Sequence, residues 1–515
     1  MKRQIFKPYE QKQDMLLPPN LEEMIPEGHL VRVVSKMIDR VDKQILERQY
    51  KGGGTSAYDP RMLLKVIVYA YTQRVFSSRR IAKELRENIN YMWLSGMNRP
   101  DHRTISRFRG KIMKAVIDEV FYEIIEQLIE AGYVDLESYF VDGTKIEANA
   151  NKYSFVWRKS VEKNKGKLKE KVKQLLEEID ALEAAEAEKY GEADLEEVGE
   201  GREIDTEALK RAAEKINERL RHAPQDKELK QAKKKIESDY LPRMEKYERY
   251  EETFEGRNSF SKTDTDATFM RMKEDHMRNG QLKPGYNIQL GTQNQFILGY
   301  SLHQRAGDTS CLKDHVEKFK TWLGTVPKRL VADAGYGSEE NYSYLEENHI
   351  NAYVKDNRFH YEQKRNYKKK NPYRADNFQY YPDEDEYECP QGKRLRYLYT
   401  APYKSDNGFI SERRIYACED CSQCPVKAEC TRAKYNRQIQ IGQEWERFKQ
   451  KARDNLMSSQ GLELRSQRPI EVEAVFGQLK QDWGFRRFLL RGLEKVTTEW
   501  GILCIAHNIA KAAVQ

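Results

Sequence analysis

Three acidic residues that lie far apart along the chain constrain its fold more than any other feature. Asp142 stands in the stretch YFVDGTK, Asp333 in LVADAGYG and Glu473 in VEAVFGQLK. The apolar residues before Asp142 and Asp333 are typical of buried strands that end there, whereas Glu473 has the spacing of a residue on the inner face of a helix. Two strands and a helix that each deliver a carboxylate predict a two-metal site of the kind that catalyses phosphoryl transfer. Nucleic-acid processing is therefore the leading functional hypothesis.

The composition indicates a large protein with several domains and extensive solvated surface. A chain of 515 residues is expected to form roughly two to four domains. Charged residues make up 33% of the chain and the mean hydropathy is -0.88, yet the net charge is only +8, so any basic DNA-binding surface must be local. The chain has neither an apolar run of the roughly 18 residues that span a bilayer nor the apolar segment of a secretory signal. We expect a cytoplasmic protein that binds no membrane.

Residues 1–132 are expected to form a helical N-terminal DNA-binding domain. Asp59-Pro60 is typical of a helix start, and Asp101 precedes a long apolar repeat with helical spacing. The first turns of that later helix carry three basic residues: Arg103, Arg107 and Arg109. They form either the solvated face of a helical bundle or a helix that contacts DNA phosphates. A glycine-rich stretch at 51–54 lacks the Gly-Lys-Ser/Thr ending of a phosphate-binding loop and so implies no ATP use.

From residue 138 the pattern changes to short apolar runs that alternate with helices. Helices are expected to open after Asp308, interpreted as an N-cap in preference to a metal ligand, and at Ser338. Strands are expected at 138–148, 286–292, 297–303, 351–354 and in the residues before Asp333. Strands followed by alternating helix and strand predict an α/β fold (α+β overall) with a mixed sheet. This core is expected to comprise residues 133–157, 258–357 and 446–515.

Two insertions are expected to interrupt this core. Residues 158–257 are rich in Lys, Glu and Ala, with apolar residues at heptad-like spacing, and predict a charged, coiled-coil-like helical hairpin; a DNA-clamping or dimerising arm is the alternative. Residues 358–445 are polar and aromatic and hold five of the seven cysteines: Cys389, Cys418, Cys421, Cys424 and Cys430. Four thiolates at such spacings can bind one structural Zn²⁺ and stabilise a segment that is poor in core residues. Five candidates for four positions leave the ligand set open, and free or redox-active cysteines are the alternative.

Taken together, these motifs resemble the DDE transposases of bacterial insertion sequences, of the branch with a helical N-terminal domain and a cysteine-containing insertion. The resemblance extends over nearly the whole chain. It rests on YDPRMLLK, FSSR, DHRTISRFR and the stretches around the three acids. It implies a ribonuclease-H-like catalytic domain, in which the first and fourth strands are adjacent and parallel so that Asp142 and Asp333 meet. It also implies that Asp142, Asp333 and Glu473 are the catalytic triad and bind two Mg²⁺ or Mn²⁺ ions.

The family's last motif places a Tyr and an Arg before the catalytic Glu and a Lys seven residues after it. Lys480 fits this pattern, and we expect it to meet a DNA phosphate from the same helix face as Glu473. The Arg position departs from the pattern. Pro469 stands four residues before Glu473, so the Arg role falls on Arg468, one residue further away, and no Tyr lies at the expected distance. Glu471 is the competing acid, but it does not have Lys480 at the required spacing.

The activity implied by the resemblance is DNA transposition. Such an enzyme binds double-stranded DNA at terminal inverted repeats, hydrolyses the 3′ ends and joins them to target DNA by transesterification. Arg486 and Arg487 add positive charge suited to DNA-end contacts, with a plain surface patch as the alternative. Synapsis of two ends implies a homodimer on DNA, associated with the bacterial nucleoid in the cytoplasm. The alternatives are a ribonuclease-H-like nuclease without strand transfer and a transposase-derived DNA-binding regulator that does not cut.

Overall fold

A mixed six-stranded sheet lies at the centre of the protein. The computed structural model describes residues 20–50, 57–190, 204–222, 224–272, 280–370, 372–405 and 407–514, so the glycine-rich stretch at 51–54 lies outside the described residues. The sheet has the order β4-β5-β1-β7-β8, and β6 also pairs with β5. Its strands are β1 (Ser138–Glu147), β4 (Thr268–Arg271), β5 (Leu282–Gln293), β6 (Phe296–His303), β7 (Arg329–Ala332) and β8 (Asn351–Val354).

The strand directions confirm the expected α/β class and mixed pairing. β5 runs antiparallel to β1, β4 and β6, whereas β7 is parallel to β1 and β8 is parallel to β7. When the edge strand β4 is left aside, the remaining strands in chain order are β1, β5, β6, β7 and β8, and the first and fourth of these are adjacent and parallel. This order is consistent with a ribonuclease-H-like sheet, and the adjacent strands β1 and β7 are those that carry or precede Asp142 and Asp333.

A polar cluster lies within the packing beneath β1. The buried Tyr139 ring of β1 lies against α12 (Leu312–Leu323), where its hydroxyl is 2.8 Å from His315 Nε2. The other ring nitrogen of His315 is 2.9 Å from the hydroxyl of Ser301 in β6. Burial lowers the pKa of His315 to about 3, so the ring is neutral in the folded protein at physiological pH.

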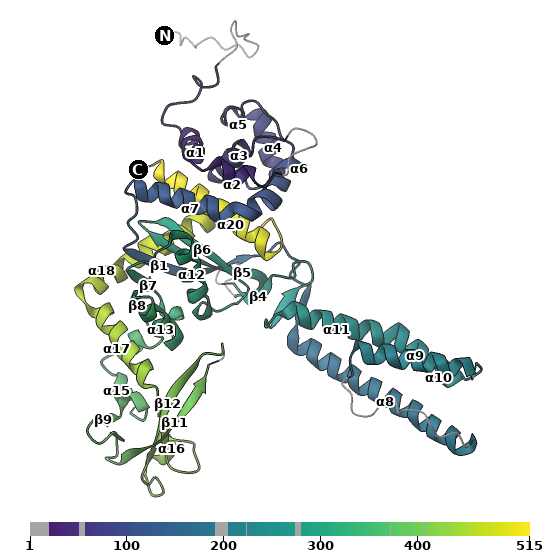
Figure 1. Cartoon of the computed structure of the whole chain (residues 1–515). Helices are drawn as coiled ribbons and strands as arrows, with labels where there is room; N and C mark the ends of the chain where they lie inside the picture. The colour runs from purple at the N-terminus through teal and green to yellow at the C-terminus, as the bar shows by residue number, and fades with distance from the viewer. Residues whose placement is uncertain are drawn as a thin grey trace, which may run out of the picture.

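The N-terminal helices pack on the sheet domain through two long helices. They are α1 (Leu30–Asp39), α2 (Lys43–Glu47), α3 (Pro60–Thr72), α4 (Ser78–Glu87), α5 (Ile89–Leu94), α6 (His102–Arg107) and α7 (Met113–Glu130). The expected caps are confirmed, because the Asp59 carboxylate accepts from Met62 N at 2.9 Å and that of Asp101 from Thr104 N at 2.7 Å. A π-helical segment, η1 (Phe108–Ile112), joins α6 to α7. α7 and the buried C-terminal helix α20 (Leu493–Ala512) lie side by side between the N-terminal helices and the sheet (Figure 1).

A long helical arm projects from the sheet domain (Figure 1). It consists of α8 (Arg158–Tyr190), α9 (Thr206–His222), α10 (Lys227–Lys235), the π segment η2 (Ile236–Tyr240) and α11 (Leu241–Phe254). Apolar side chains such as Leu168, Val172 and Ile216 form a core that belongs to the arm alone. The chain enters and leaves through two short paired strands, β2 (Phe155–Trp157) and β3 (Ser259–Ser261). The helical hairpin expected from the charged heptads is therefore present.

The cysteine-rich insertion forms a second, antiparallel sheet. Its order is β13-β12-β11-β10-β9, with β9 (Gln379–Tyr381), β10 (Glu386–Glu388), β11 (Arg394–Lys404), β12 (Ile410–Cys418) and β13 (Gln438–Ile441). α14 (Phe359–Glu362) and α15 (Tyr367–Lys370) precede it, and α16 (Lys427–Cys430) lies within it. The chain returns to the central sheet through α17 (Gln443–Met457) and α18 (Ser459–Arg468). Among the helices described, none has the length and apolar character to cross a membrane.

Candidate active site

The pairing of β1 with β7 brings the two aspartates to the same part of the sheet. Val141 of β1 is opposite Ala332 of β7, so the next residues, Asp142 and Asp333, are neighbours across the two strands. The Asp142 side chain is only 12% exposed, whereas that of Asp333 is 40% exposed. The Asp333 carboxylate accepts from Gly335 N at 2.8 Å, which fixes the turn after β7. The sequence prediction that these two residues meet is therefore confirmed in geometry.

Glu473 reaches the same place from the helical run that follows α18. It ends the π-helical segment η6 (Pro469–Glu473), which follows α18 and packs against β1 and β5. α19 (Ala474–Gly477) and a second π segment, η7 (Gln478–Asp482), continue the same helical run. The half-exposed Glu473 side chain lies on the face of this run that looks toward the two aspartates.

The guanidinium of Arg468 joins all three carboxylates. Its Nη1 atom is 2.9 Å from Glu473 Oε1, and its Nη2 atom is 3.3 Å from Asp142 Oδ1 and 3.8 Å from Asp333 Oδ2. The Arg468 side chain is 12% exposed, so its charge is mostly shielded from solvent at this point. One cation thus lies where the three acids converge, and no other residue pairs with all three in the described part of the chain.

The π segment explains why Arg468 could stand one residue outside the expected spacing. In η6 the Ala474 N–H bonds to the carbonyl of Pro469, five residues earlier, instead of the four of an α-helix. A turn that holds one extra residue brings positions five apart onto the same face. Arg468 and Glu473 are five apart, and their side chains are in contact. The irregular spacing is therefore compensated by the helix geometry.

The donor atoms of the site suit a hard divalent cation. All three acids offer carboxylate oxygens, which Mg²⁺ and Mn²⁺ prefer. These carboxylates already pair with one positive group, the guanidinium of Arg468. As the side chains stand, the described residues contain no group of three or more His, Cys, Asp or Glu spaced to hold a metal ion. At the acidic site, the three carboxylates pair with Arg468. A metal ion bound by these acids would have to displace this guanidinium or bind beside it.

Glu471, the competing acid, has a different environment. Its carboxylate is buried and accepts from Gln295 N at 2.8 Å, in the turn between β5 and β6, with the Thr292 hydroxyl at 3.5 Å. Burial raises its pKa, against the lowering effect of these backbone hydrogen bonds. Glu471 therefore anchors the helical run to the sheet, on the side away from the aspartates.

Lysine and arginine side chains lie along the edge of the site. Lys480 Nζ is 3.2 Å from the hydroxyl of Thr144, two residues beyond Asp142 in β1. Arg486 and Arg487 are exposed, and their Nε atoms donate to the carbonyls of Lys480 and Ala148, each at 3.2 Å. These bonds hold the segment after η7 against the end of β1. Lys480 is thus brought to the acids, with Arg486 and Arg487 on the adjoining surface.

The three arginines at the start of the α6–α7 run do not share one environment. Arg103 and Arg107 are exposed, as a phosphate-contacting role requires. Arg109 is buried, and the prediction that it contacts DNA is wrong. Its Nη1 donates to the Tyr71 hydroxyl at 2.9 Å and to the Phe76 carbonyl at 2.8 Å, so it ties α3 and the loop after it to η1.

Asp308 lies closer to the site than its sequence context indicated. It stands at the helix start, but its side chain makes no capping hydrogen bond within the described structure. Its Oδ1 instead accepts from the Asn287 and Gln289 amides of β5, at 2.8 and 3.0 Å. A Cβ on Gly143 would lie 2.4 Å from that oxygen. Glycine after Asp142 therefore leaves the space that Asp308 occupies, and the interpretation of Asp308 as a side-chain N-cap is wrong.

Lys355 also lies near the site, and the sequence analysis did not single it out. It directly follows β8, the parallel neighbour of β7, and so lies at the same edge as Asp333. Burial, followed by the charges of Arg465 and Arg468, lowers its pKa, while Asp333 and Glu473 act in the opposite direction. Its place after a parallel strand was the signal that could have found it.

The five cysteines of the insertion come together. Cys389, Cys418, Cys421, Cys424 and Cys430 all line one small cavity of about 20 Å³, and all are free thiols. Their side chains do not form a ready metal-holding group among the residues described. The remaining two, Cys311 and Cys504, are fully buried in the core.

Comparisons with known proteins bear on both ends of the chain. A family model described as "Transposase DDE domain" matches residues 388–513, which include Glu473 and Lys480 but not the two aspartates. A second, described as "Transposase domain (DUF772)", matches residues 19–111. Two curated proteins from strains of Halobacterium salinarum, each named "Probable transposase for insertion sequence element ISH11", are 31% identical over 98 residues. That stretch covers 19% of this chain and 28% of each relative, and no solved structure matches the chain.

Proposed function

We propose that the chain is a DDE transposase of an insertion sequence, which cuts DNA at the ends of such an element and joins them to target DNA; the matches to transposase models near both ends of the chain support this. The observation that carries the proposal is the convergence of Asp142, Asp333 and Glu473 on one cation, Arg468. Three carboxylates from two parallel strands and a helix form an arrangement suited to phosphoryl transfer on DNA.

In this proposal Asp142, Asp333 and Glu473 hold two Mg²⁺ or Mn²⁺ ions. When bound, such ions activate water or a 3′-hydroxyl and stabilise the leaving oxygen. Asp142, the least exposed of the three, fixes the position of the site in the sheet, and Asp333 and Glu473 are free to adjust from the turn and the helix. Before the ions arrive, the single charge of Arg468 offsets one of the three negative charges.

Positively charged side chains near the site would bind the DNA backbone. Lys480 lies beside β1 and is suited to hold a phosphate next to the scissile bond. Arg486 and Arg487 extend this positive surface, and Arg103 and Arg107 offer a second one on the N-terminal helices. We propose double-stranded element ends and target DNA as the partners, bound by a homodimer. The helical N-terminal domain (1–132) would carry much of the end recognition.

A structural zinc ion in the insertion is part of the same proposal. Soft thiolates suit Zn²⁺, and five cysteines around one cavity supply enough of them after small side-chain rotations. The buried residues of this insertion form only a small cluster around Leu395 and Tyr416, so a metal would add stability where the core is small.

The test is a Mg²⁺-dependent cleavage and joining assay on a plasmid that carries the DNA flanking the gene. Wild type is compared with Asp142→Asn, Asp333→Asn and Glu473→Gln, and each should lose cleavage by a factor of at least about 10² to 10³, as removal of a main charged group at a reacting phosphate does. Glu471→Gln is the matched control, because it changes the same chemistry two residues away and leaves the acids around Arg468 intact.

The outcome separates the candidate functions. Cleavage with joining supports transposition, whereas cleavage without joining indicates a nuclease on the same fold. Binding of the flanking DNA with no cleavage indicates a DNA-binding regulator. Cleavage by all three triad variants at the wild-type rate would show that the site is wrongly assigned.

A further inference from the structure

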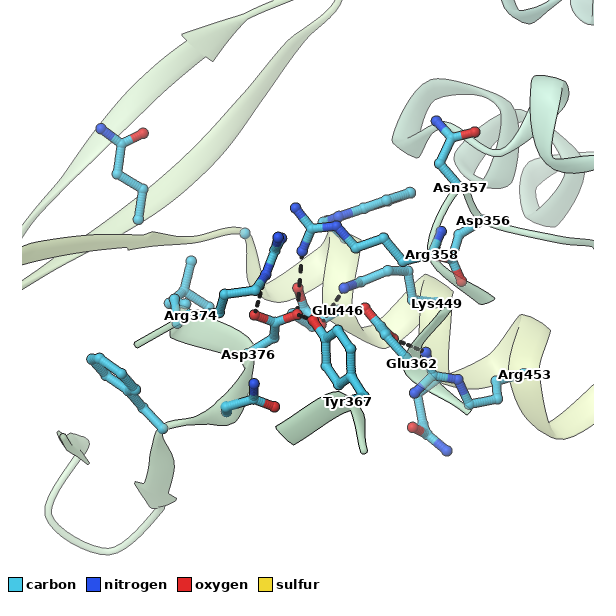
Figure 2. Close-up of a pocket in the computed structure, with 18 of the residues that line it drawn as sticks. Asp356, Asn357, Arg358, Glu362, Tyr367, Arg374, Asp376, Glu446, Lys449 and Arg453 are labelled. Carbon is cyan, nitrogen blue, oxygen red and sulfur yellow. Dashed lines mark hydrogen bonds and ion pairs between the residues drawn. The ribbon is translucent and has the colours of Figure 1, made fainter. Parts of the chain in front are cut away.

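A large cavity lies between the central sheet and the cysteine-rich insertion, outside the acidic site. Its volume is about 1060 Å³, and its walls come from the loop after β8, from α14 and α15, from β13 and from α17. Figure 2 shows charged side chains from these segments pointing toward one another, with Arg358 and Arg374 on either side of Asp376. No role described so far uses this cavity.

The cavity lies next to the acidic site. Gly337, in the turn that starts at Asp333, lines it together with Asp356, which follows β8. The two segments are in direct contact, because a Cβ on Gly337 would lie 2.4 Å from the carbonyl oxygen of Lys355. The side chain of Lys355 is near enough to Asp333 and Glu473 for them to affect its pKa. The turn after Asp333 and the loop after β8 therefore border both the acidic site and the cavity.

The lining is strongly basic. Eight Lys or Arg residues line it against four Asp or Glu residues, an excess of four positive charges. Some of the charge is neutralised locally, as in the pair Lys449 Nζ to Glu446 Oε2 at 2.7 Å and the contact of Arg453 with Glu362. Within the described ranges, three lining residues have no carboxylate partner: Lys364, Arg365 and Arg437. A buried Nε of Arg437 also lacks a hydrogen-bond acceptor there.

Aromatic side chains share the lining with these cations. Tyr373, Tyr387 and Trp445 are partly exposed at the cavity wall. Basic residues that follow a phosphate backbone, combined with rings on which bases stack, are what proteins use to bind single-stranded nucleic acid. A volume of about 1060 Å³ corresponds to roughly 10 Å on each edge. That is too narrow for a B-form duplex, whose major groove alone is about 12 Å wide.

We propose that this cavity binds a single-stranded segment of DNA that extends from the acidic site. Lys364, Arg365 and Arg437 hold its phosphates, and the rings of Tyr373 and Trp445 stack on its bases. The inference rests on the proposed function, because it takes DNA as the substrate. It adds that the strand around the scissile phosphate is separated from its complement and guided into the insertion.

The test measures binding of fluorescein-labelled oligothymidylate by fluorescence anisotropy, without added Mg²⁺ or Mn²⁺ so that no cleavage occurs and without a chelator so that any bound zinc is retained. The exposed pair Lys364→Gln/Arg365→Gln should weaken binding about tenfold and reduce the slope of log K against log salt by about 1.4, since each single-strand phosphate contact contributes about 0.7. Tyr373→Leu should weaken binding about fivefold or more with the slope unchanged, because stacking is not ionic. Circular dichroism checks that each variant is folded.

The matched control is Arg432→Gln/Lys434→Gln. It removes the same charge from exposed positions in the same insertion, outside the cavity lining, and should change affinity less than threefold. If this control weakens binding as much as the cavity pair, or if the cavity pair binds like wild type, the inference is overturned. Duplex binding and plasmid cleavage are measured beside it. If wild type cleaves DNA but the cavity pair Lys364→Gln/Arg365→Gln binds single strands as wild type does, only the cavity proposal is rejected. If wild type does not cleave DNA but the cavity pair binds single strands more weakly, only the transposase activity is rejected.

Discussion

Replacement of Arg468 by Gln should make the acidic site bind divalent cations more tightly. Arg468 is a cation held 2.9 to 3.8 Å from oxygen atoms of all three acids. A metal ion that binds these acids must either displace the guanidinium or bind beside it, and both cost free energy. Gln keeps most of the side-chain length and its hydrogen-bonding ability but removes the charge.

The size of the effect follows from the charges and distances. Two unit charges about 4 Å apart interact by about 1 kcal/mol in bulk water, so a dication beside the guanidinium is repelled by about 2 kcal/mol. The half-exposed side chains of Asp333 and Glu473 justify the dielectric of water as the conservative choice. Since 1.4 kcal/mol is a tenfold change, we expect Arg468→Gln to bind Mn²⁺ about 10- to 30-fold more tightly.

Mn²⁺ binding is measured by electron paramagnetic resonance of the free ion at low salt, without DNA, so that the result does not depend on catalysis. Arg468→Lys keeps the charge and should stay within about threefold of wild type. Arg465→Gln is the matched control for net charge. Its guanidinium stacks on the Phe359 ring at 5.1 Å, and it pairs with none of the three acids. The same Arg468→Gln protein should cleave DNA poorly, because the arginine also orders the acids.

Two results would refute this reasoning. Equal Mn²⁺ affinity in wild type and Arg468→Gln would show that the guanidinium does not compete with the metal. An equal gain in Arg465→Gln would show that the overall field of the domain, and not the contact with the acids, governs affinity.

Three further predictions concern stability and metal content. Gly143→Ala should destabilise the protein by about 1–3 kcal/mol in urea unfolding, since the new methyl displaces the hydrogen-bonded Asp308; Gly477→Ala, where nothing lies within 4 Å, should not. Purified protein should contain about one zinc ion per chain by mass spectrometry. Cys421→Ser should lower this zinc content, whereas Cys311→Ser should not. Wild-type protein without zinc would contradict the proposed zinc site. The pKa of His315 is lowered to about 3 from an unfolded value of about 6.5, so the unfolded chain takes up the proton first as pH falls. Stability should therefore decline from about pH 6.5 toward pH 4, less steeply in His315→Gln, and an identical pH profile in that variant would contradict the assignment.

The strands and the helix that carry the acids could be predicted from local signals, whereas the meeting of Asp142 and Asp333 was implied by the resemblance to DDE transposases. Apolar runs before Asp142 and Asp333 mark strands. β1 does not end at Asp142 but continues to Glu147, so the predicted range 138–148 agrees with the structure and a strand end at Asp142 does not. The choice of Glu473 over Glu471 came from the family motif, in which a Lys follows the Glu by seven residues, as Lys480 follows Glu473. Each of these inferences uses residues within one or two turns or strands of one another.

The errors arose where partners meet only through the tertiary structure. An arginine near two others at a helix start gives no sign that Tyr71 and Phe76 will bury it, as happens to Arg109. An aspartate at a helix start is typical of an N-cap, and only the tertiary structure brings the Asn287 and Gln289 amides of β5 to Asp308. Burial and hydrogen bonds to residues distant in sequence determine the environments of Arg109 and Asp308. The spacing of residues along the chain contains neither kind of information.

The π segment η6 has a consequence for how this kind of site tolerates change in its gene. One added codon in an α-helix rotates everything beyond it by about 100°, which would turn either the arginine or the glutamate away from the sheet. A single wide turn absorbs that rotation, so the residues on both sides keep their orientation while their separation in sequence grows by one. Homologous positions in such proteins are therefore better matched by what a side chain touches than by counting residues between motifs.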